Sequence, residues 1–317
     1  MRKHRTLALG ATLLALLVSA CTSGGDGSPS AEGSQSAELP SVSIGSAGFS
    51  EAALVAEIYA QALEANGFTV ERHLELGERP AVRAAFDGEE INLAPDYIGG
   101  LASLLEADVS ADPEETHANL LTALEPIGQT ALDYSPGTDA DGFAVRQETA
   151  EELELENMSD LAEVADQLIW GLASGCPENP LCGPGLNDVY GIDINDPAIE
   201  TESLDPCSTE IAIALNTAGT SGDYAIDVAQ VCTTQAEIAQ FNFKLLTDDQ
   251  GLAPAQNIAP VLTQELADAG GDTLADALNA VSALLTTEEL TNLNLLIAEQ
   301  QSFEDIADQW LTDNGLK

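Results

Sequence analysis

The sequence predicts an α/β protein with mostly parallel sheets and two lobes. Short apolar strands alternate with amphipathic helices along nearly all of the chain after residue 40, which is typical of parallel sheets with helical crossovers. One series of elements begins at residue 41, a second begins at residue 141, and a return segment follows. We expect the chain to cross between the lobes near 136–143 and 244–250. One lobe then comprises 41–140 and 248–317, and the other comprises 141–247.

The first series begins with a strand and a helix that are joined by a loop of small residues. The strand is "SVSIGS" (41–46), and the helix runs from Ser50, a good N-cap residue, to Asn66. Such a loop is either a plain turn or a place where a small, partly negative group sits against the helix N-terminus. The other elements predicted for this series are strands at 68–76, 91–97 and 129–135, a helix at 80–87, and two helical stretches that end near residue 125.

The second series and the return segment follow the same alternation. Segments that begin at Thr286 and at Ser302 have the side chains of helix starts, with acidic residues in the first turn. The elements predicted here are strands at 141–146, 167–174, 224–231, 241–246 and 257–263, a helix at 179–191, a helix after Cys207, and three final helices at 272–285, 287–300 and 303–313.

The charge of the chain is strongly negative and excludes one class of partner. Among 317 residues, 54 are Asp or Glu and only 9 are Lys or Arg, so the formal net charge is −45. Three of the nine cations lie within the first five residues, and no acid precedes Asp26. A surface this acidic repels nucleic acid phosphates. The acids are dispersed, which keeps a protein hydrated in strong salt and hints at a salty habitat.

The N-terminus is predicted to be a lipoprotein signal peptide (1–20). "MRKHR" is a basic region, "TLALGATLLALLV" is an apolar run too short for a comfortable membrane span, and "VSAC" (18–21) matches a bacterial lipobox. Cys21 would be lipidated, although an ordinary signal peptide with a chance Cys is the alternative. The Gly- and Ser-rich segment that follows predicts a flexible linker (21–40). We expect a protein anchored to the outer face of the cell membrane, with a folded part that begins near Leu39.

The other cysteines fit this oxidising location. Four cysteines remain, and an even number outside the cytosol indicates disulfides. We favour pairs Cys176–Cys182 and Cys207–Cys232, and zinc is the rival explanation. The spacings are not those that zinc prefers, and no His lies nearby.

The sequence is poor in catalytic motifs. It contains no GxSxG, HExxH, phosphate-binding loop or GxGxxG pattern. His73 and His117 are interpreted as surface residues, and paired cysteines cannot act as nucleophiles. We therefore predict no enzyme activity, no cofactor and no metal.

Four segments resemble one family of solute-binding proteins. They are "GSAGFSEAALVAEIYAQALEANGFTVER" (45–72), "NLAPDYIGG" (92–100), "GPGLNDVYGI" (183–192) and "TDDQGLAPAQNIAPVLTQEL" (247–266). In this order they are similar to the binding proteins of ABC importers for glycine betaine, choline and related osmolytes. The resemblance covers nearly the whole chain after residue 40. It implies the type II periplasmic-binding-protein fold, whose two lobes close over a small ligand.

The resemblance also implies a ligand and its contacts. A quaternary ammonium group cannot donate hydrogen bonds, so aromatic faces hold it through cation–π attraction. Tyr97 and Tyr190 match tyrosines of the family's motifs and would form the aromatic cage. The loop at 45–50 would be the first ligand loop, with Phe49 against the methyl groups. The ligand-binding residues expected from this loop are Ser46, Phe49 and Ser50.

The sequence departs from the family's pattern at several of these positions. A basic residue of the family is Ala47 here, and a threonine of the family is Ile98. Tyr134 is a further candidate for the cage. Arg146 could replace the missing cation as partner of a ligand carboxylate, and an exposed salt bridge is its alternative role. The ligand is therefore left open among choline, a bulkier betaine and an uncharged osmolyte.

The expected function is that of a lipid-anchored receptor outside the cytoplasm. It would capture a small quaternary-ammonium or other osmolyte and deliver it to the membrane subunits of an ABC importer. A receptor for another small polar solute is one alternative. A surface lipoprotein with an enzymatic or adhesive role is the other.

Overall fold

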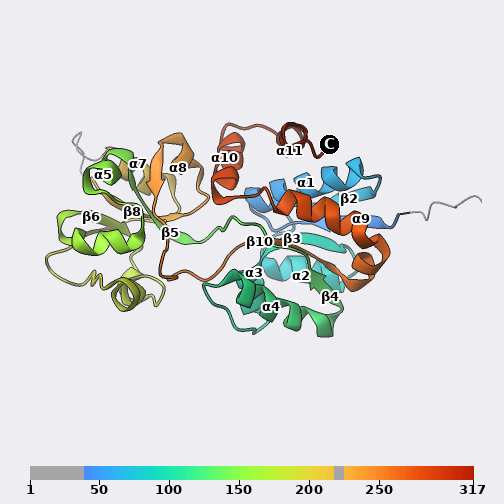
Figure 1. The fold of residues 1–317 in the computed structure, drawn as a ribbon, viewed down its shortest axis with the longest axis horizontal. Coiled ribbons are helices and arrows are strands. Elements are labelled where there is room, and N and C mark those ends of the chain that lie inside the picture. The colour runs from blue at the N-terminus through green and yellow to red at the C-terminus, as the bar shows by residue number, and fades with distance from the viewer. Residues whose placement is uncertain (1–38, 218–224) are drawn as a thin grey trace, which may run out of the picture. The chain divides into compact units, whose positions relative to one another are not determined.

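The structure of the protein is a computed structural model that describes residues 39–217 and 225–317. The predicted signal peptide, Cys21, the linker up to residue 38 and the start of the strand predicted at 224–231 lie outside the described residues. The described chain forms two five-stranded sheets, each flanked by helices (Figure 1). This confirms the predicted α/β class.

The first sheet has the strand order β2-β1-β3-β10-β4. Strands β1, β2 and β3 are parallel to one another, and β10 runs antiparallel to both of its neighbours. The strands are β1 (Ser41–Gly45), β2 (Thr69–His73), β3 (Leu93–Tyr97), β4 (Gln129–Ala131) and β10 (Ile258–Thr263).

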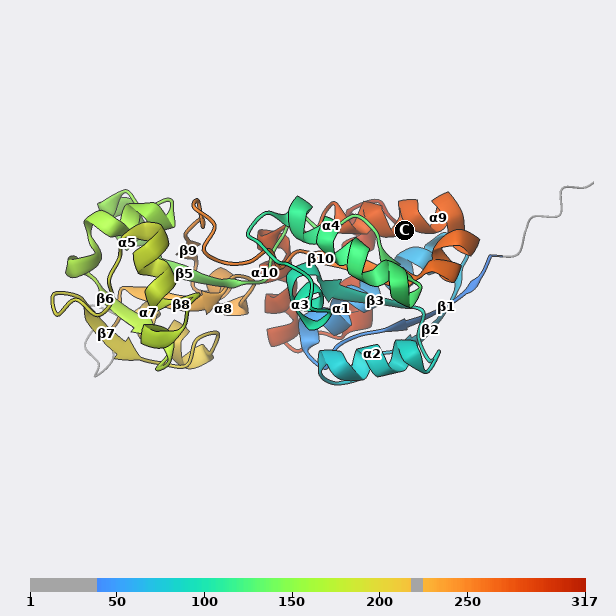
Figure 2. The same cartoon turned by 90° about the horizontal axis from the view of Figure 1, so that it is seen from below.

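Helices cover both faces of this sheet (Figure 1). Alternate side chains of β10 point to opposite faces of the sheet. Ile258 and Leu262 pack with α1 on one face, whereas Ala259 and Val261 pack with α3 and α4 on the other. Helix α2 covers another part of the second face, beside β1, and Figure 2 shows it apart from α4. The helices of this lobe are α1 (Ser50–Ala65), α2 (Arg79–Asp87), α3 (Ile98–Leu104), α4 (Pro113–Leu124), α9 (Gln264–Ser282), α10 (Thr287–Ala298) and α11 (Phe303–Asp313).

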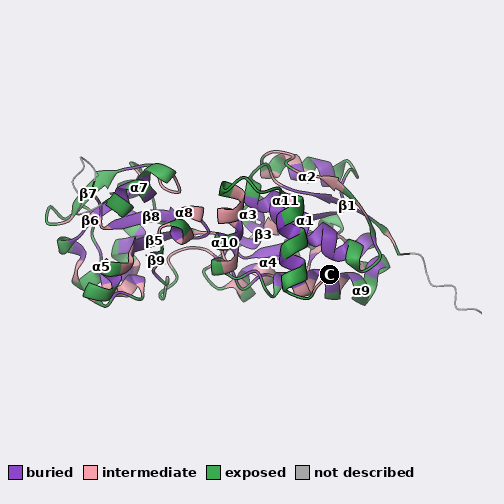
Figure 3. Ribbon diagram, turned by 90° about the horizontal axis from the view of Figure 1, so that it is seen from above, coloured by how far each residue is buried: buried purple, intermediate pink, exposed green. Residues whose placement is uncertain are grey.

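Helix α1 is the centre of the first lobe's core. Of its 16 residues, 13 are buried, because the sheet, α9 and α11 all pack against α1. Tyr59 is fully buried, and its hydroxyl forms a hydrogen bond of 2.8 Å with the hydroxyl of Ser282 in α9. Figure 3 shows burial concentrated on α1 and the strands, with exposed residues on the outer helices. The helix is apolar over most of its circumference because most of its circumference packs against other elements.

The second sheet has the strand order β7-β6-β8-β5-β9. Strands β6, β7 and β8 are parallel, and β5 runs antiparallel to both of its neighbours. Its strands are β5 (Asp141–Arg146), β6 (Ile169–Leu172), β7 (Glu200–Ser203), β8 (Val228–Cys232) and β9 (Phe243–Leu245). The helices of this part are α5 (Gln147–Leu153), α6 (Gly183–Gly185), α7 (Thr209–Thr217) and α8 (Ala236–Gln240).

Each sheet therefore contains one antiparallel strand, which is β10 in the first sheet and β5 in the second. Each of them is the first strand that the chain forms after it has crossed from the other sheet. The chain passes from β4 to β5 and returns from β9 to β10. The two passing segments are joined by an antiparallel bridge between Thr138 and Asn257. The N–H of Asp139 also donates to the carbonyl of Gln256 at 3.1 Å.

Two predicted helices differ from those observed. The helix predicted at 179–191 is broken into α6 and a π-helical turn at Leu186–Tyr190. The helix predicted at 272–285 matches the second part of α9, which begins after the non-helical Gly271 (φ 52°, ψ −149°) and ends at Ser282. A helical segment that was not predicted precedes it from Gln264. The starts predicted at Thr286 and Ser302 are confirmed, because each side chain accepts a backbone N–H three residues on.

Both predicted disulfides, Cys176–Cys182 and Cys207–Cys232, are present. The zinc alternative is therefore wrong for these four sulfur atoms. The first bond lies in the core of the second lobe, where both cysteines are fully buried. The second bond ties the segment before α7 to the end of β8. Among the described residues, no helix is both long and apolar enough to cross a membrane.

Candidate functional site

The loop between β1 and α1 is held by its own backbone and side-chain contacts. The Ser46 hydroxyl is fully buried, accepts the N–H of Glu75 at 2.8 Å and donates to the Ala47 carbonyl. The Gly48 N–H donates to the Gly77 carbonyl at 2.8 Å, and a Cβ on Gly48 would lie 2.9 Å from the Gly77 Cα. This close approach explains why residue 48 is a glycine.

The first turn of α1 differs from the prediction at its cap. The N-cap is Phe49, whose side chain makes no capping bond, and Ser50 is the exposed first residue of the helix. The prediction that Ser50 caps the helix is therefore wrong. The first turn of the helix also contains a carboxylate, that of Glu51, whose side chain is only 7% exposed. Negative charge is stabilised there by the helix dipole.

Phe49 and Tyr97 form an aromatic pair beside this helix start. Their ring centroids lie 5.7 Å apart. Phe49 is 44% exposed, whereas Tyr97, the last residue of β3, is 6% exposed. The Tyr97 hydroxyl donates a hydrogen bond to the Glu51 carboxylate. Burial, followed by the charges of Glu51 and Asp139, raises the pKa of Tyr97 well above its usual value, so the hydroxyl keeps its proton.

The Glu51 carboxylate has a second donor from a distant part of the chain. Asn294 of α10 donates through Nδ2 to Glu51 Oε2 at 2.5 Å and to the Thr234 carbonyl at 2.8 Å. Thr234 lies just after β8 of the second sheet. Asn294 therefore links helix α1 to a loop of the other lobe.

Asp139 lies in the first segment that passes between the sheets. Burial, and then the charge of Glu51, raises the pKa of Asp139 to about 7, while hydrogen bonding from Thr234 opposes the shift. Its Oδ1 atom is buried and has no hydrogen-bond partner. Among the described residues, one other buried side-chain oxygen or nitrogen lacks a partner, and it is Oε1 of Gln235.

The segment that contains Asp139 and the segment that contains Gln235 are joined by hydrogen bonds. The Thr233 N–H donates to the Ala140 carbonyl at 2.9 Å, and the Ala140 N–H donates to the Thr233 hydroxyl at 3.0 Å. The aromatic pair, the two carboxylates and the Thr234 loop thus lie together where the two lobes are joined. We call this group the acidic site, and it consists of Phe49, Glu51, Tyr97, Asp139 and Thr234.

The described contacts do not join Tyr190 to the acidic site. Tyr190 is 6% exposed and packs in the core of the second lobe with Cys176 and Cys182. Its hydroxyl donates to the Asp248 carboxylate and accepts the Gln250 N–H at 3.0 Å. Tyr190 thereby fixes the segment that leads back to the first lobe. Its contact with a ligand stays a prediction.

Tyr134 and Arg146 also lie in other surroundings. The Tyr134 ring packs edge-on against His117, with centroids 5.2 Å apart. Arg146 donates to the carbonyls of Leu215 and Ile226 and forms a salt bridge of 2.8 Å with Asp227. The guanidinium of Arg146 is thus engaged within the second lobe. The alternative of a salt bridge holds for it, with both side chains partly buried.

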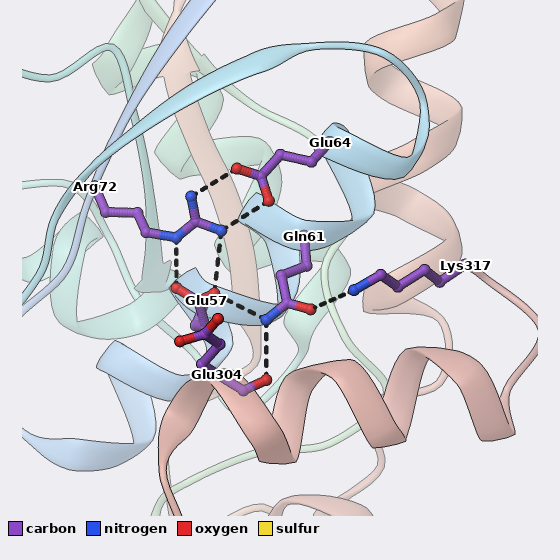
Figure 4. Close-up of polar contacts among 6 residues, drawn as sticks. All are labelled: Glu57, Gln61, Glu64, Arg72, Glu304 and Lys317. Carbon is purple, nitrogen blue, oxygen red and sulfur yellow. Dashed lines mark hydrogen bonds and ion pairs between the residues drawn. The ribbon is translucent and has the colours of Figure 1, made fainter.

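Another polar cluster lies on the outer side of α1, and its side chains form hydrogen bonds and ion pairs with one another (Figure 4). Arg72 donates to both Glu57 and Glu64, at 2.6 Å and 2.7 Å. Gln61 donates to Glu57 and accepts from Lys317, whose amine also pairs with an acid of α11. A surface cavity of about 610 Å³ adjoins these residues. We assign this cluster to anchoring the C-terminus on α1.

The arrangement of two mixed sheets, joined by two passing segments, defines a type II periplasmic-binding-protein fold. A crystal structure described as a glycine betaine/carnitine/choline ABC transporter superposes with a TM-score of 0.77 at 22% identity, covering 87% of this chain and 99% of that one. Apo YehZ from Escherichia coli superposes with a TM-score of 0.78 at 22% identity and the same coverage. These structures confirm the predicted fold.

The chain belongs to the OpuAC family, the substrate-binding domains of ABC-type glycine betaine transport systems, whose profile matches residues 40–313. The chain is similar to the glycine betaine-binding protein YehZ of Escherichia coli K12, at 26% identity over 86% of this chain and 90% of YehZ. It is also similar to the carnitine transport binding protein OpuCC of Listeria monocytogenes serotype 1/2a, at 26% identity over 92% of this chain and 91% of OpuCC. The predicted family resemblance is confirmed.

Proposed function

We propose that this protein captures a small quaternary-ammonium osmoprotectant outside the cytoplasm and delivers it to an ABC importer. The observation that carries the proposal is the Phe49–Tyr97 pair beside the carboxylates of Glu51 and Asp139. An aromatic face and a buried negative charge are the two features that attract a cation without hydrogen-bond donors on its nitrogen. Membership of the family supports the same solute class.

The exposure of Phe49 gives the ligand a free aromatic face. Each cation–π contact contributes about 0.5–2 kcal/mol. Asp139 and Thr234 lie at the junction of the lobes, so a ligand that contacts them together with Phe49 would favour the conformation in which they approach one another. A receptor for another small polar solute is the second candidate, because Asp139 and Gln235 offer unpartnered acceptors.

Calorimetric titration of the purified folded domain with a panel of solutes tests this function. We expect saturable binding of at least one member among glycine betaine, choline and carnitine. The comparison solutes are ectoine and amino acids. Binding only of solutes without a quaternary nitrogen would favour the second candidate.

We further propose that Cys21 carries the lipid that holds the receptor on the outer face of the cell membrane. Cys21→Ala is expected to move the protein from the membrane fraction to the soluble fraction while the folded domain keeps its melting temperature. Fractionation followed by immunoblotting measures this, with Ser23→Ala as a matched control that stays bound. A Cys21→Ala variant that remains on membranes would contradict the lipidation.

A further inference from the structure

We propose that the acidic site selects solutes that combine a positive charge with a hydroxyl or N–H donor, and disfavours zwitterions such as glycine betaine. Choline, an alcohol with a quaternary nitrogen, represents the favoured class. This inference rests on the proposed function, because it names the solute class of the same site.

The first observation is the pair of unpartnered acceptors. Buried polar groups in folded proteins are nearly always hydrogen-bonded, and an unpaired one costs about 1–3 kcal/mol. Only two such buried atoms occur among residues 39–217 and 225–317, Asp139 Oδ1 and Gln235 Oε1. Gln235 is 9% exposed, and its segment is bonded to that of Asp139 through Thr233 and Ala140. Both free atoms are acceptors, but the Gln235 amide is already fixed through its Nε2 atom, which donates to the Ser208 carbonyl at 3.1 Å. The inference therefore rests on Asp139 Oδ1, and the partner that this acceptor lacks is a donor.

Glycine betaine cannot supply this donor. Its nitrogen is fully methylated, and its carboxylate only accepts hydrogen bonds. The hydroxyl of choline can donate to Asp139 while the methylated nitrogen rests against Phe49. A protonated amine with an N–H group would satisfy the same requirement.

The second observation is the balance of charge. After residue 38 the sequence contains six Lys and Arg residues, all described by the structure. Each of them already donates to another group of the protein. Their partners are Glu57 and Glu64 for Arg72, Asp96 for Arg79, Gln129 for Arg83, Asp227 for Arg146, Glu156 for Lys244 and Asp308 for Lys317.

A ligand carboxylate would therefore meet negative charge without a free cation. The start of α1, which could otherwise receive an anionic group, already holds Glu51. Asp139 lies near enough for its charge to affect Tyr97, and Asp141 at the start of β5 adds to the field at Asp139. Like charges brought together in a poorly hydrated site repel strongly.

The experiment compares three ligands that differ in charge and in one donor. At pH 8, choline, its O-methyl ether and glycine betaine are titrated by calorimetry into the parent and two variants. Asp139→Asn removes the charge and converts the group into one that can donate. Asp141→Asn is the matched control, because it removes one charge from the same segment at an exposed position.

We expect the parent to bind choline about tenfold more tightly than the ether, which corresponds to one hydrogen bond to a charged group. Glycine betaine should bind more weakly than choline. Asp139→Asn should lose about tenfold in choline affinity and the preference for choline over the ether, whereas Asp141→Asn should keep this preference. Circular dichroism melting checks that both variants remain folded.

A pH series adds an independent readout. The groups that act on Asp139 are Glu51 from α1, Thr234 from the loop after β8 and Asp141 from β5, and Asp139 in turn acts on Tyr97. Because its pKa is raised to about 7, Asp139 gains its charge as pH rises from 6 to 8, and choline affinity should rise with it. In Asp139→Asn this rise should be lost.

Three results would overturn the inference. They are equal or tighter binding of glycine betaine by the parent, equal binding of choline and its ether, and an unchanged preference in Asp139→Asn. In each case a quaternary ammonium still binds, so the proposed function stands. If no solute of the panel binds, the proposed function fails, and this inference fails with it.

Discussion

Truncation of Tyr97 to Ala is expected to lower the free energy of unfolding by about 3–5 kcal/mol and to abolish measurable solute binding. The ring is 6% exposed and packs in the core cluster of α1 and β10. Its removal leaves a cavity and takes away the side chain that supports Phe49. Denaturant unfolding measures the first effect, and calorimetric titration measures the second.

Tyr97→Phe separates the hydroxyl from the ring. A tyrosine in an open cleft would tolerate this change, but the Tyr97 hydroxyl donates to the buried carboxylate of Glu51. The variant leaves that oxygen short of a donor, so we expect a loss of about 1–3 kcal/mol in unfolding free energy. Tyr134→Phe is the control, because its ring is partly exposed and packs on His117. Equal stability of Tyr97→Phe and the parent would contradict the role given to the hydroxyl.

Gly137→Ala is expected to lower the unfolding free energy by about 1–3 kcal/mol and to weaken solute binding as well. A Cβ at this position would lie 2.5 Å from the Leu285 carbonyl oxygen and 2.5 Å from the Thr286 carbonyl carbon. Both are backbone atoms, so no side-chain rotation relieves the clash. The Gly137 N–H also donates to the Leu285 carbonyl at 2.8 Å. Gly137 precedes Asp139 by two residues, so a shift of the backbone at Gly137 would also move Asp139.

Gly175→Ala is the matched control for this substitution. Gly175 has a φ of −87°, which any residue adopts, and no atom lies within 4 Å of its Cβ position. Melting temperatures of the two variants should therefore differ clearly, with Gly175→Ala close to the parent. Parent-like stability and affinity in Gly137→Ala would mean that the passing segment can move away from α10 without cost.

The order of strands and helices and the mostly parallel arrangement of the sheets could be predicted from the sequence, but the antiparallel direction of β5 and β10 could not. The strand at Asp141–Arg146 matches its prediction because a Gly-Phe-Ala-Val run follows a polar stretch. Its antiparallel direction depends on where the chain enters the second sheet, and no local pattern carries that information. Strand β7 (Glu200–Ser203) was not predicted, because it is an exposed edge strand without apolar residues.

The aromatic half of the acidic site could be predicted, and its charged half could not. Phe49 and Tyr97 lie in segments that resemble the family's motifs. Among 54 acidic residues, Asp139 carries no signal in the sequence, and Glu51 carries only a weak one. Their significance comes from burial and from partners far along the chain, such as Asn294, which is 243 positions from Glu51. One usable sign was the position of Glu51 in the first turn after the ligand loop.

The most direct test of the central claim compares the parent and Phe49→Ala by calorimetric titration with the best quaternary-ammonium solute of the panel. Phe49 is 44% exposed, so its truncation should leave the melting temperature unchanged. We predict saturable binding by the parent and about tenfold weaker binding by Phe49→Ala, because a cation–π contact is lost. Equal affinities in the two proteins, or no saturable binding by the parent, would contradict the claim that this site captures a quaternary ammonium solute.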